Sequence, residues 1–120
     1  MKAIVYGNGS FADYVSYVIS SETDYDIVGY CVDAAFIGAD NNLNGLPIVP
    51  FESVERSFSP VEHEMFIAIG DNEVREQKFF QAIEKGFSLL SYISPKADTW
   101  RDLKYGRNVF LSSECAVQPL

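Results

Sequence analysis

A glycine-rich turn near the start of the chain has the residue types that bind phosphate groups. Gly7-Asn8-Gly9-Ser10-Phe11-Ala12 has the pattern G-x-G-x-x-A and directly follows the apolar run Ala3-Ile4-Val5-Tyr6. Gly7 allows a tight turn, Gly9 lets a phosphate approach the backbone, and the small Ala12 lets a helix pack closely. Backbone N–H groups and the dipole at a helix start attract anions. The pattern predicts a phosphate or pyrophosphate site; the alternative interpretation is a turn with a structural role only.

Two other segments offer polar groups where apolar runs end. Asp33, followed by Ala34, comes 24 residues after Gly9, a spacing that suits a carboxylate binding ribose hydroxyls. It could instead bind a sugar amine or hydroxyl, or be a solvated aspartate at a strand end. Gly70 permits close approach of a ligand, and the next two residues either contact that ligand or cap a helix, or do both through different atoms. The predicted ligand-binding residues are Gly7, Asn8, Gly9, Ser10, Phe11, Asp33, Ala34, Gly70, Asp71 and Asn72.

The sequence offers no residue set for catalysis or metal binding. His63 is the single histidine and precedes an apolar run, so we expect it at the surface, at the amino end of a strand and away from the ligand. No Ser/His/Asp, Cys/His or metal-ligand arrangement accompanies it. Cys31 and Cys115 lack CxxC spacing and are expected to be buried, reduced thiols. We therefore expect no catalytic residue and no metal site in this chain.

Composition limits the classes of partner. The 120 residues amount to about one domain, with 48% hydrophobic and 22% charged residues, as in globular proteins. A formal net charge of −8 disfavours nucleic acid and anionic membranes as partners, because both require basic surfaces. No signal peptide and no apolar run of membrane-spanning length is visible, so we expect a cytoplasmic protein without a membrane span.

Apolar runs alternate with helical patterns along the first ninety residues. Strands are expected at 3–6, 27–32, 65–69 and 87–93, with a short one at 46–49. A helix should follow the glycine turn, with Ser10 as its N-cap and Asp13 completing a variant capping box. A weak helix is expected at 51–58, and a longer one should begin at Asp71 and stop at Gly86. Residues 34–47 are expected to form mostly loop.

This alternation predicts an α/β fold, a Rossmann-like parallel sheet with flanking helices. In such sheets ligands bind at the carboxyl ends of the strands. The segments 7–11, 33–36 and 70–72 should therefore converge at one edge of the sheet.

The hydrophobic pattern of the sequence changes from about Pro95, after which no helical periodicity is visible. Two short β-like segments, Asn108–Ser112 and Cys115–Val117, lie about six residues apart, which hints at a β-helix coil. We expect two domains, a ligand-binding domain at 1–94 and the first, incomplete coils of a β-helix at 95–120.

Several of these segments together resemble one enzyme family. The chain is similar to the N-terminal domain of bacterial sialic-acid-type sugar O-acetyltransferases and nucleotide-amino-sugar N-acetyltransferases. The most specific segment is Ala68-Ile69-Gly70-Asp71-Asn72-Glu73-Val74-Arg75. Ile93-Ser94-Pro95-Lys96-Ala97 resembles the family's entry to a left-handed β-helix, and Tyr105–Leu111 resembles a first hexapeptide coil. The chain departs from many relatives at Phe11-Ala12, where they have Gly-His.

The resemblance implies a function in surface-glycan biosynthesis. In this family the N-terminal domain binds a UDP-sugar, and a trimeric β-helix binds acetyl-CoA and supplies a histidine that deprotonates the acceptor amine or hydroxyl. Gly7, Gly9, Ser10 and Phe11 would then lie near the diphosphate or sugar. The same pocket would be lined by Asp33, Gly70, Asp71 and Asn72. Because the catalytic histidine and the coenzyme site are expected after Leu120, we expect the 120-residue chain to be inactive alone.

Two other functions share parts of this pattern. An NAD-binding Rossmann domain of an oxidoreductase or redox sensor would also have the glycine turn and Asp33, although it would not predict the hexapeptide-like tail. A non-catalytic module that binds a sugar nucleotide and regulates a partner is the third interpretation.

Overall fold

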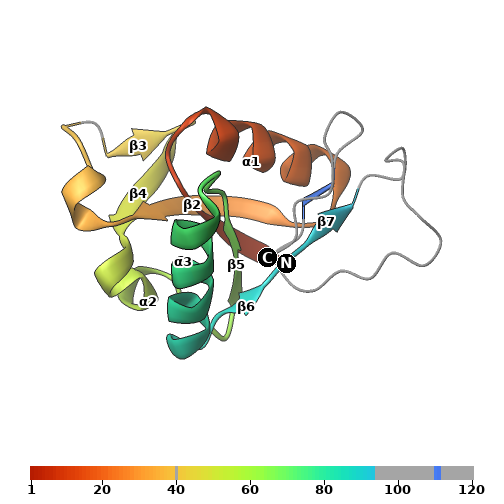
Figure 1. Ribbon diagram of the computed structural model, residues 1–120. Coiled ribbons are helices and arrows are strands. Elements are labelled where there is room, and N and C mark those ends of the chain that lie inside the picture. The colour runs from red at the N-terminus through yellow and green to blue at the C-terminus, as the bar shows by residue number, and fades with distance from the viewer. Residues whose placement is uncertain (40, 94–109, 112–120) are drawn as a thin grey trace.

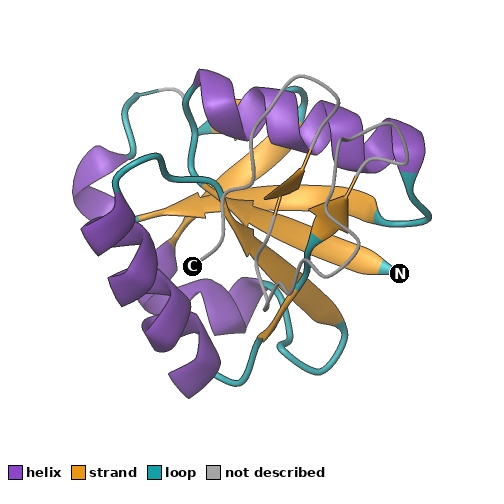
Figure 2. Ribbon diagram, turned by 45° about the vertical axis from the view of Figure 1, so that its right-hand side comes forward, coloured by secondary structure: helices purple, strands orange, loops and turns teal. Residues whose placement is uncertain are grey.

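The computed structural model describes residues 1–39, 41–93 and 110–111, and its main feature is a six-stranded sheet with helices on both faces (Figures 1 and 2). The sheet has the order β3-β4-β2-β1-β5-β6. Its strands are β1 (Lys2–Tyr6), β2 (Asp26–Val32), β3 (Asn42–Leu43), β4 (Leu46–Pro50), β5 (His63–Ile67) and β6 (Ser88–Leu89). The helices are α1 (Ser10–Glu22), α2 (Val54–Ser57) and α3 (Asn72–Glu84), with 3₁₀ turns η1 (Ala34–Phe36) and η2 (Phe51–Ser53). The predicted α/β class, a mostly parallel sheet with flanking helices, is confirmed.

Strand β1 lies at the centre and pairs in parallel on both sides. Tyr6, its last residue, is in register with Cys31 of β2 and with Ile67 of β5. The chain leaves β1 toward β2 through α1, whereas β5 lies on the other side of β1. The order of strands therefore reverses at β1, and such a switch point leaves a crevice at the carboxyl ends of the strands.

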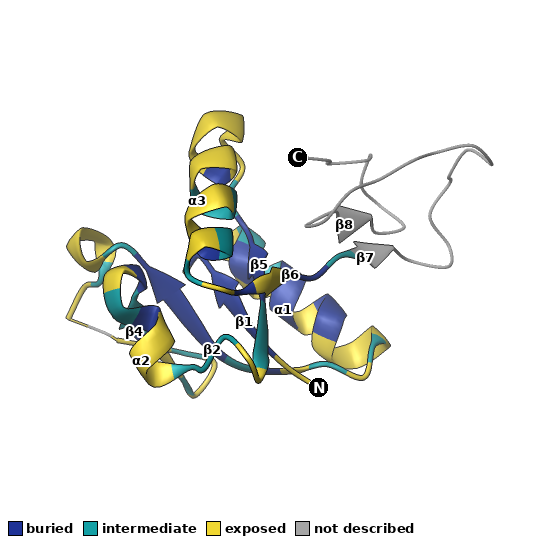
Figure 3. Ribbon diagram, turned by 90° about the horizontal axis from the view of Figure 1, so that it is seen from below, coloured by how far each residue is buried: buried dark blue, intermediate teal, exposed yellow. Residues whose placement is uncertain are grey.

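Both faces of the sheet are buried, which explains the continuous apolar runs. Val5 of β1 packs toward α1, in a core cluster that includes Val15 and Ile19. Its neighbour Ile4 points to the opposite face, in a cluster with Val54 of α2 and Ala82 of α3. Figure 3 shows the result: the central strands are largely dark blue and lie between helices whose outer faces are exposed.

The ends of the two long helices are built differently. As predicted, Asp71 caps α3, because its carboxylate accepts hydrogen bonds from the amides of Glu73 and Val74 at 2.9 and 3.1 Å. Gly86, with φ of +98°, follows that helix as predicted. The predicted N-cap of α1 is wrong: Gly9 occupies that position, no side chain forms a cap bond, and Ser10 is already the first helical residue.

Three strand predictions differ from the structure. The segment predicted as loop includes β3, whereas the short strand predicted at 46–49 is present as β4. The two strands form a hairpin because Asn44 and Gly45 both have positive φ, at 55° and 78°, as a tight two-residue turn requires. Strand β5 begins at His63, two residues earlier than predicted. The strand predicted at 87–93 is divided, since the chain leaves β5 after the Leu90 amide bonds to Met65. Strand β7 (Tyr92–Ile93) then pairs in parallel with β8 (Phe110–Leu111).

Residues outside the crevice lie mostly where the sequence predicts. His63 starts β5 at the amino edge, and its Nδ1 lies 2.9 Å from the carbonyl oxygen of Ser59. Cys31 is a buried free thiol whose pKa is raised by burial. Cys115 and the predicted β-helix segment lie outside the described residues, except for Phe110–Leu111. No helix within the described ranges has both the length and the apolar character that crossing a bilayer requires.

The difference between the two helix starts predicts a difference in stability. Asp71→Ala removes a side chain that satisfies two helix amides and should lower the free energy of unfolding by about 1 kcal/mol. Ser10→Ala removes no cap bond and should change it by less than about 0.5 kcal/mol. Urea unfolding followed by circular dichroism measures both values. Equal losses in the two variants would contradict the assignment of the caps.

Candidate functional site

A cavity of about 670 Å³ lies at the carboxyl edge of the sheet, at the switch point. It brings together the loop after β1, the end of β2, the loop after β5 and the first turns of α3. Residues of the three segments 7–11, 33–36 and 70–72 therefore meet at this edge, as the sequence predicts. The lining residues are Tyr6, Gly7, Asn8, Gly9, Phe11, Ala12, Val32, Asp33, Phe36, Ala68, Ile69, Gly70, Val74, Gln77 and Lys78.

Gly7 closes the turn that forms one wall of the cavity. Its φ is +132°, and a Cβ there would lie 2.9 Å from the carbonyl oxygen of Ala68 and 3.2 Å from the Cβ of Ala12. Its amide donates to the carbonyl of Cys31 at 2.8 Å and is therefore used by the fold. The part of the loop suited to an anion is consequently the start of α1 around Gly9, where helix amides have no intrahelical acceptor.

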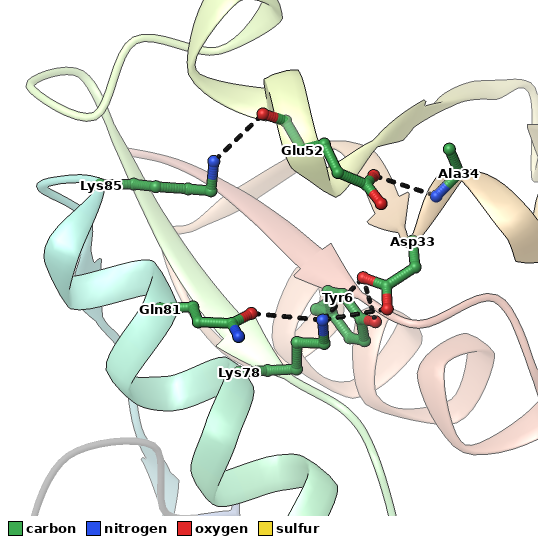
Figure 4. A network of polar contacts seen from close by, with 7 residues as sticks. All are labelled: Tyr6, Asp33, Ala34, Glu52, Lys78, Gln81 and Lys85. Carbon is green, nitrogen blue, oxygen red and sulfur yellow. Dashed lines mark hydrogen bonds and ion pairs between the residues drawn. The ribbon is translucent and has the colours of Figure 1, made fainter.

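Asp33 lies at the centre of a polar network at the end of β2 (Figure 4). Lys78, reaching over from α3, places its Nζ 2.7 Å from Asp33 Oδ1 and 3.0 Å from Oδ2. The Tyr6 hydroxyl, from the end of β1, donates to Oδ1 at 3.0 Å. Burial, and then the hydrogen bond to Asp33, raise the pKa of Tyr6, so the phenol stays protonated and donates. The carboxylate that directly follows β2 is thus held by side chains from β1 and α3.

A second cavity, of about 580 Å³, adjoins the first and shares Asp33 and Lys78 with it. Lys85, the residue that directly follows α3, lines only this second cavity and pairs with Glu55 at 3.1 Å. Both lysine Nζ atoms lie over the ring of Phe51, at 5.0 and 5.2 Å from its centroid. The ion pair of Asp33 and Lys78 therefore separates the two cavities.

Comparison with known proteins assigns the fold. Residues 2–82 match the family described as the PglD N-terminal domain. The chain belongs to this family. No match was found among curated proteins.

Solved structures agree with this assignment to the PglD N-terminal domain family. The acetyltransferase domain of PglB from Neisseria gonorrhoeae FA1090, in complex with acetyl coenzyme A, is 23% identical with a TM-score of 0.71, covering 91% of this chain and 51% of that one. PerB from Caulobacter crescentus, in complex with CoA and GDP-perosamine, is 23% identical with a TM-score of 0.72, covering 92% and 51%. A variant of perosamine N-acetyltransferase from the same organism, with the same ligands, is 24% identical with a TM-score of 0.70, covering 92% of this chain and 51% of that one. At these identities the likeness shows the fold, and the chain spans about half the length of each.

Within this family fold, the predicted ligand-binding residues divide into two groups. Six line the cavity: Gly7, Asn8, Gly9, Phe11, Asp33 and Gly70. The other four, Ser10, Ala34, Asp71 and Asn72, do not line it. Three of them make hydrogen bonds within the protein instead. The Asp71 carboxylate caps α3 and the Asn72 side chain accepts from Arg75, both locally, whereas the Ala34 amide donates to the more distant Glu52. Ser10 is exposed on the first turn of α1.

Sequence reasoning missed several residues of the cavity, above all Tyr6 and Lys78. Tyr6 ends an apolar run and has the pattern of a core residue, yet its hydroxyl reaches the carboxylate at the neighbouring strand end. Lys78 shares one face of α3 with the buried Ala82, at helical spacing. A lysine on the inner face of a helix was the available signal. No group of three His, Cys, Asp or Glu side chains suited to a metal occurs in the part of the chain that the structure describes.

The geometry at Gly7 predicts a stability requirement for glycine. Gly7→Ala should lower the free energy of unfolding by about 2 kcal/mol, because the added Cβ meets backbone and the positive φ is strained. Gly70→Ala is the matched control in the same cavity, since a Cβ there would have nothing within 4 Å, and we expect a change below about 0.5 kcal/mol. Urea denaturation gives both values, and a Gly7 variant as stable as the control would contradict this geometry.

Proposed function

We propose that this chain is the nucleotide-sugar-binding domain of a coenzyme-A-dependent sugar acetyltransferase of surface-glycan biosynthesis. The acetyl group would pass to an amine or hydroxyl of the sugar. The observation that supports this most directly is the cavity at the switch point of a PglD N-terminal domain fold, lined by a glycine turn and an aspartate. Complexes of the structurally similar PerB contain CoA and GDP-perosamine, which supports a nucleotide-linked sugar as the ligand class.

The cavity offers a place for each part of such a ligand. The diphosphate would bind at the start of α1, where a Cβ at Gly9 would have nothing within 4 Å and a helix N-terminus favours an anion. Asp33 would accept hydrogen bonds from ribose or sugar hydroxyls, because Oδ2 has one protein donor and can accept another. Phe36, which is 69% exposed, and Val74 add apolar surface to the same cavity. We propose UDP as the nucleotide, and GDP is the alternative that the titration below compares with it.

We assign acyl transfer itself to parts of the protein other than the described fold. His63 lies at the amino edge of the sheet, opposite the cavity, so it cannot reach a ligand bound there. We propose that residues 1–94 form the binding domain and that 95–120 begin a left-handed β-helix. A trimeric β-helix would bind acetyl-CoA and supply the catalytic histidine. The buried free thiol of Cys31 is consistent with a cytoplasmic location.

One observation favours a second candidate, an NAD-binding domain. The glycine turn and Asp33 stand at the ends of adjacent parallel strands, as in dinucleotide-binding folds. In this chain, however, Lys78 and Tyr6 already engage that carboxylate, which leaves it fewer acceptor positions for both ribose hydroxyls.

Calorimetric titration of the 120-residue chain separates these functions. We expect saturable binding of a UDP- or GDP-linked amino sugar, weaker or no binding of NAD, and no acetyl transfer when acetyl-CoA is added. NAD binding without nucleotide-sugar binding would overturn the proposal. Acetyl transfer by the chain alone would refute the assignment of binding to this domain and of acyl transfer to other parts of the protein.

A matched pair of variants tests the position of the diphosphate. Gly9→Asp puts a carboxylate at the N-cap of α1, where aspartate is a favourable residue, so the fold should persist. The carboxylate should repel a diphosphate and weaken nucleotide-sugar binding by roughly tenfold or more. Gly9→Asn provides a neutral cap of the same shape and should weaken binding less. Equal affinities of the two variants would place the diphosphate elsewhere.

A further inference from the structure

The charges that line the main cavity balance only because of one lysine. Among the lining residues, Asp33 is the acidic side chain and Lys78 the basic one. The chain as a whole carries a formal charge of −8, so its overall field opposes an anionic ligand. A cavity that receives a diphosphate must therefore avoid adding an uncompensated carboxylate of its own.

Lys78 is held too firmly to act as a mobile phosphate ligand. Its ammonium group donates to both oxygens of Asp33 and to Gln81 Oε1, at 2.7, 3.0 and 3.2 Å, which uses its three hydrogens. It also lies over the rings of Phe51 and Tyr6, with centroids 5.0 and 5.6 Å away. The side chain is 12% exposed. Moving it toward a phosphate would give up all of these contacts at once.

We propose that Lys78 is a specificity-determining positioning residue, which neutralises and orients Asp33 so that the same cavity accepts an anionic group at the glycine turn. This inference rests on the proposed function, because it concerns the diphosphate of the same ligand. Tyr6 assists by donating to the same carboxylate from the other side. Asp33 remains an acceptor for hydroxyls, while its charge is cancelled before the diphosphate enters.

Inorganic pyrophosphate is the probe that isolates this effect, because it has charge but no sugar hydroxyl. NMR titration of amide shifts in the full chain measures its affinity even when binding is weak. Lys78→Met leaves Asp33 uncompensated and should weaken pyrophosphate binding by roughly tenfold at low salt, and less at high salt. Lys78→Arg keeps the charge and should retain the wild-type affinity within about threefold.

The decisive variant combines Lys78→Met with Asp33→Asn. If Lys78 acts by cancelling the charge of Asp33, the double variant should recover most of the lost pyrophosphate affinity. If Lys78 instead bound phosphate directly, the double variant would lose that contact and stay clearly below wild type, recovering only the part of the affinity that repulsion by Asp33 had removed. If Lys78 only supported the fold, the double variant would stay as weak as Lys78→Met. Either result would overturn the proposal. It would also be overturned if Lys78→Met had no effect, or if wild-type protein did not bind pyrophosphate.

Lys85→Met is the matched control, because Lys85 stands at the end of the same helix and over the same Phe51 ring but does not line the main cavity. Its affinity for pyrophosphate should equal that of wild type. Thermal unfolding checks each variant, and Lys78→Gln replaces the Met variant if that one does not fold. The outcomes are separable from the proposed function: absence of nucleotide-sugar binding to wild type refutes that function, whereas normal binding with no recovery in the double variant refutes only the role of Lys78.

Discussion

Parallel pairing of β1 with both β2 and β5 is the constraint from which the other features of this structure follow. Because parallel strands in register end together, the chain must turn three times at one edge, after Tyr6, Val32 and Ile67. The helices that reconnect the strands must cross the faces of the sheet, so both faces become buried. The cavity lies at this edge, where the loops after β1 and β5 lead to helices on opposite faces of the sheet.

The same pairing explains why glycine is needed at the first turn. The loop after β1 passes so close to Ala68, which follows β5, that a side chain at position 7 would meet backbone. The chain can reach the start of α1 only with a positive φ at that residue. The helix start is then fixed beside the cavity, where its amides can act on a ligand.

Charge is the second property that the arrangement controls. Asp33 directly follows β2, Tyr6 ends β1, and Lys78 faces inward from α3, so residues from three parts of the chain form one network of zero net charge. At these identities the likeness to PglB and PerB shows the fold and says nothing of this network. A shared fold can therefore hold sites with different ligand preferences, which depend on the residues placed at its edge.

Short-range patterns in the sequence predicted most of the elements and the edge at which they meet, but they missed β3 and did not show that the segment 87–93 is divided. Apolar runs predicted the buried strands, glycines marked the turns, and Asp71 was correctly predicted as a helix cap, because each of these depends on neighbours a few residues away. The sequence could not say which side chains at that edge would be used up by the protein itself. Lys78 and Asp33 are 45 residues apart, and only packing α3 against the sheet brings them to 2.7 Å. Long-range packing likewise decided that Gly7 gives its amide to the fold, whereas short-range bonds turned Asp71 and Asn72 away from the cavity. Adjacent residues determine the local chemistry. Which donors and acceptors bind a ligand and which bind the protein itself depends on distances that exist only once the chain has folded.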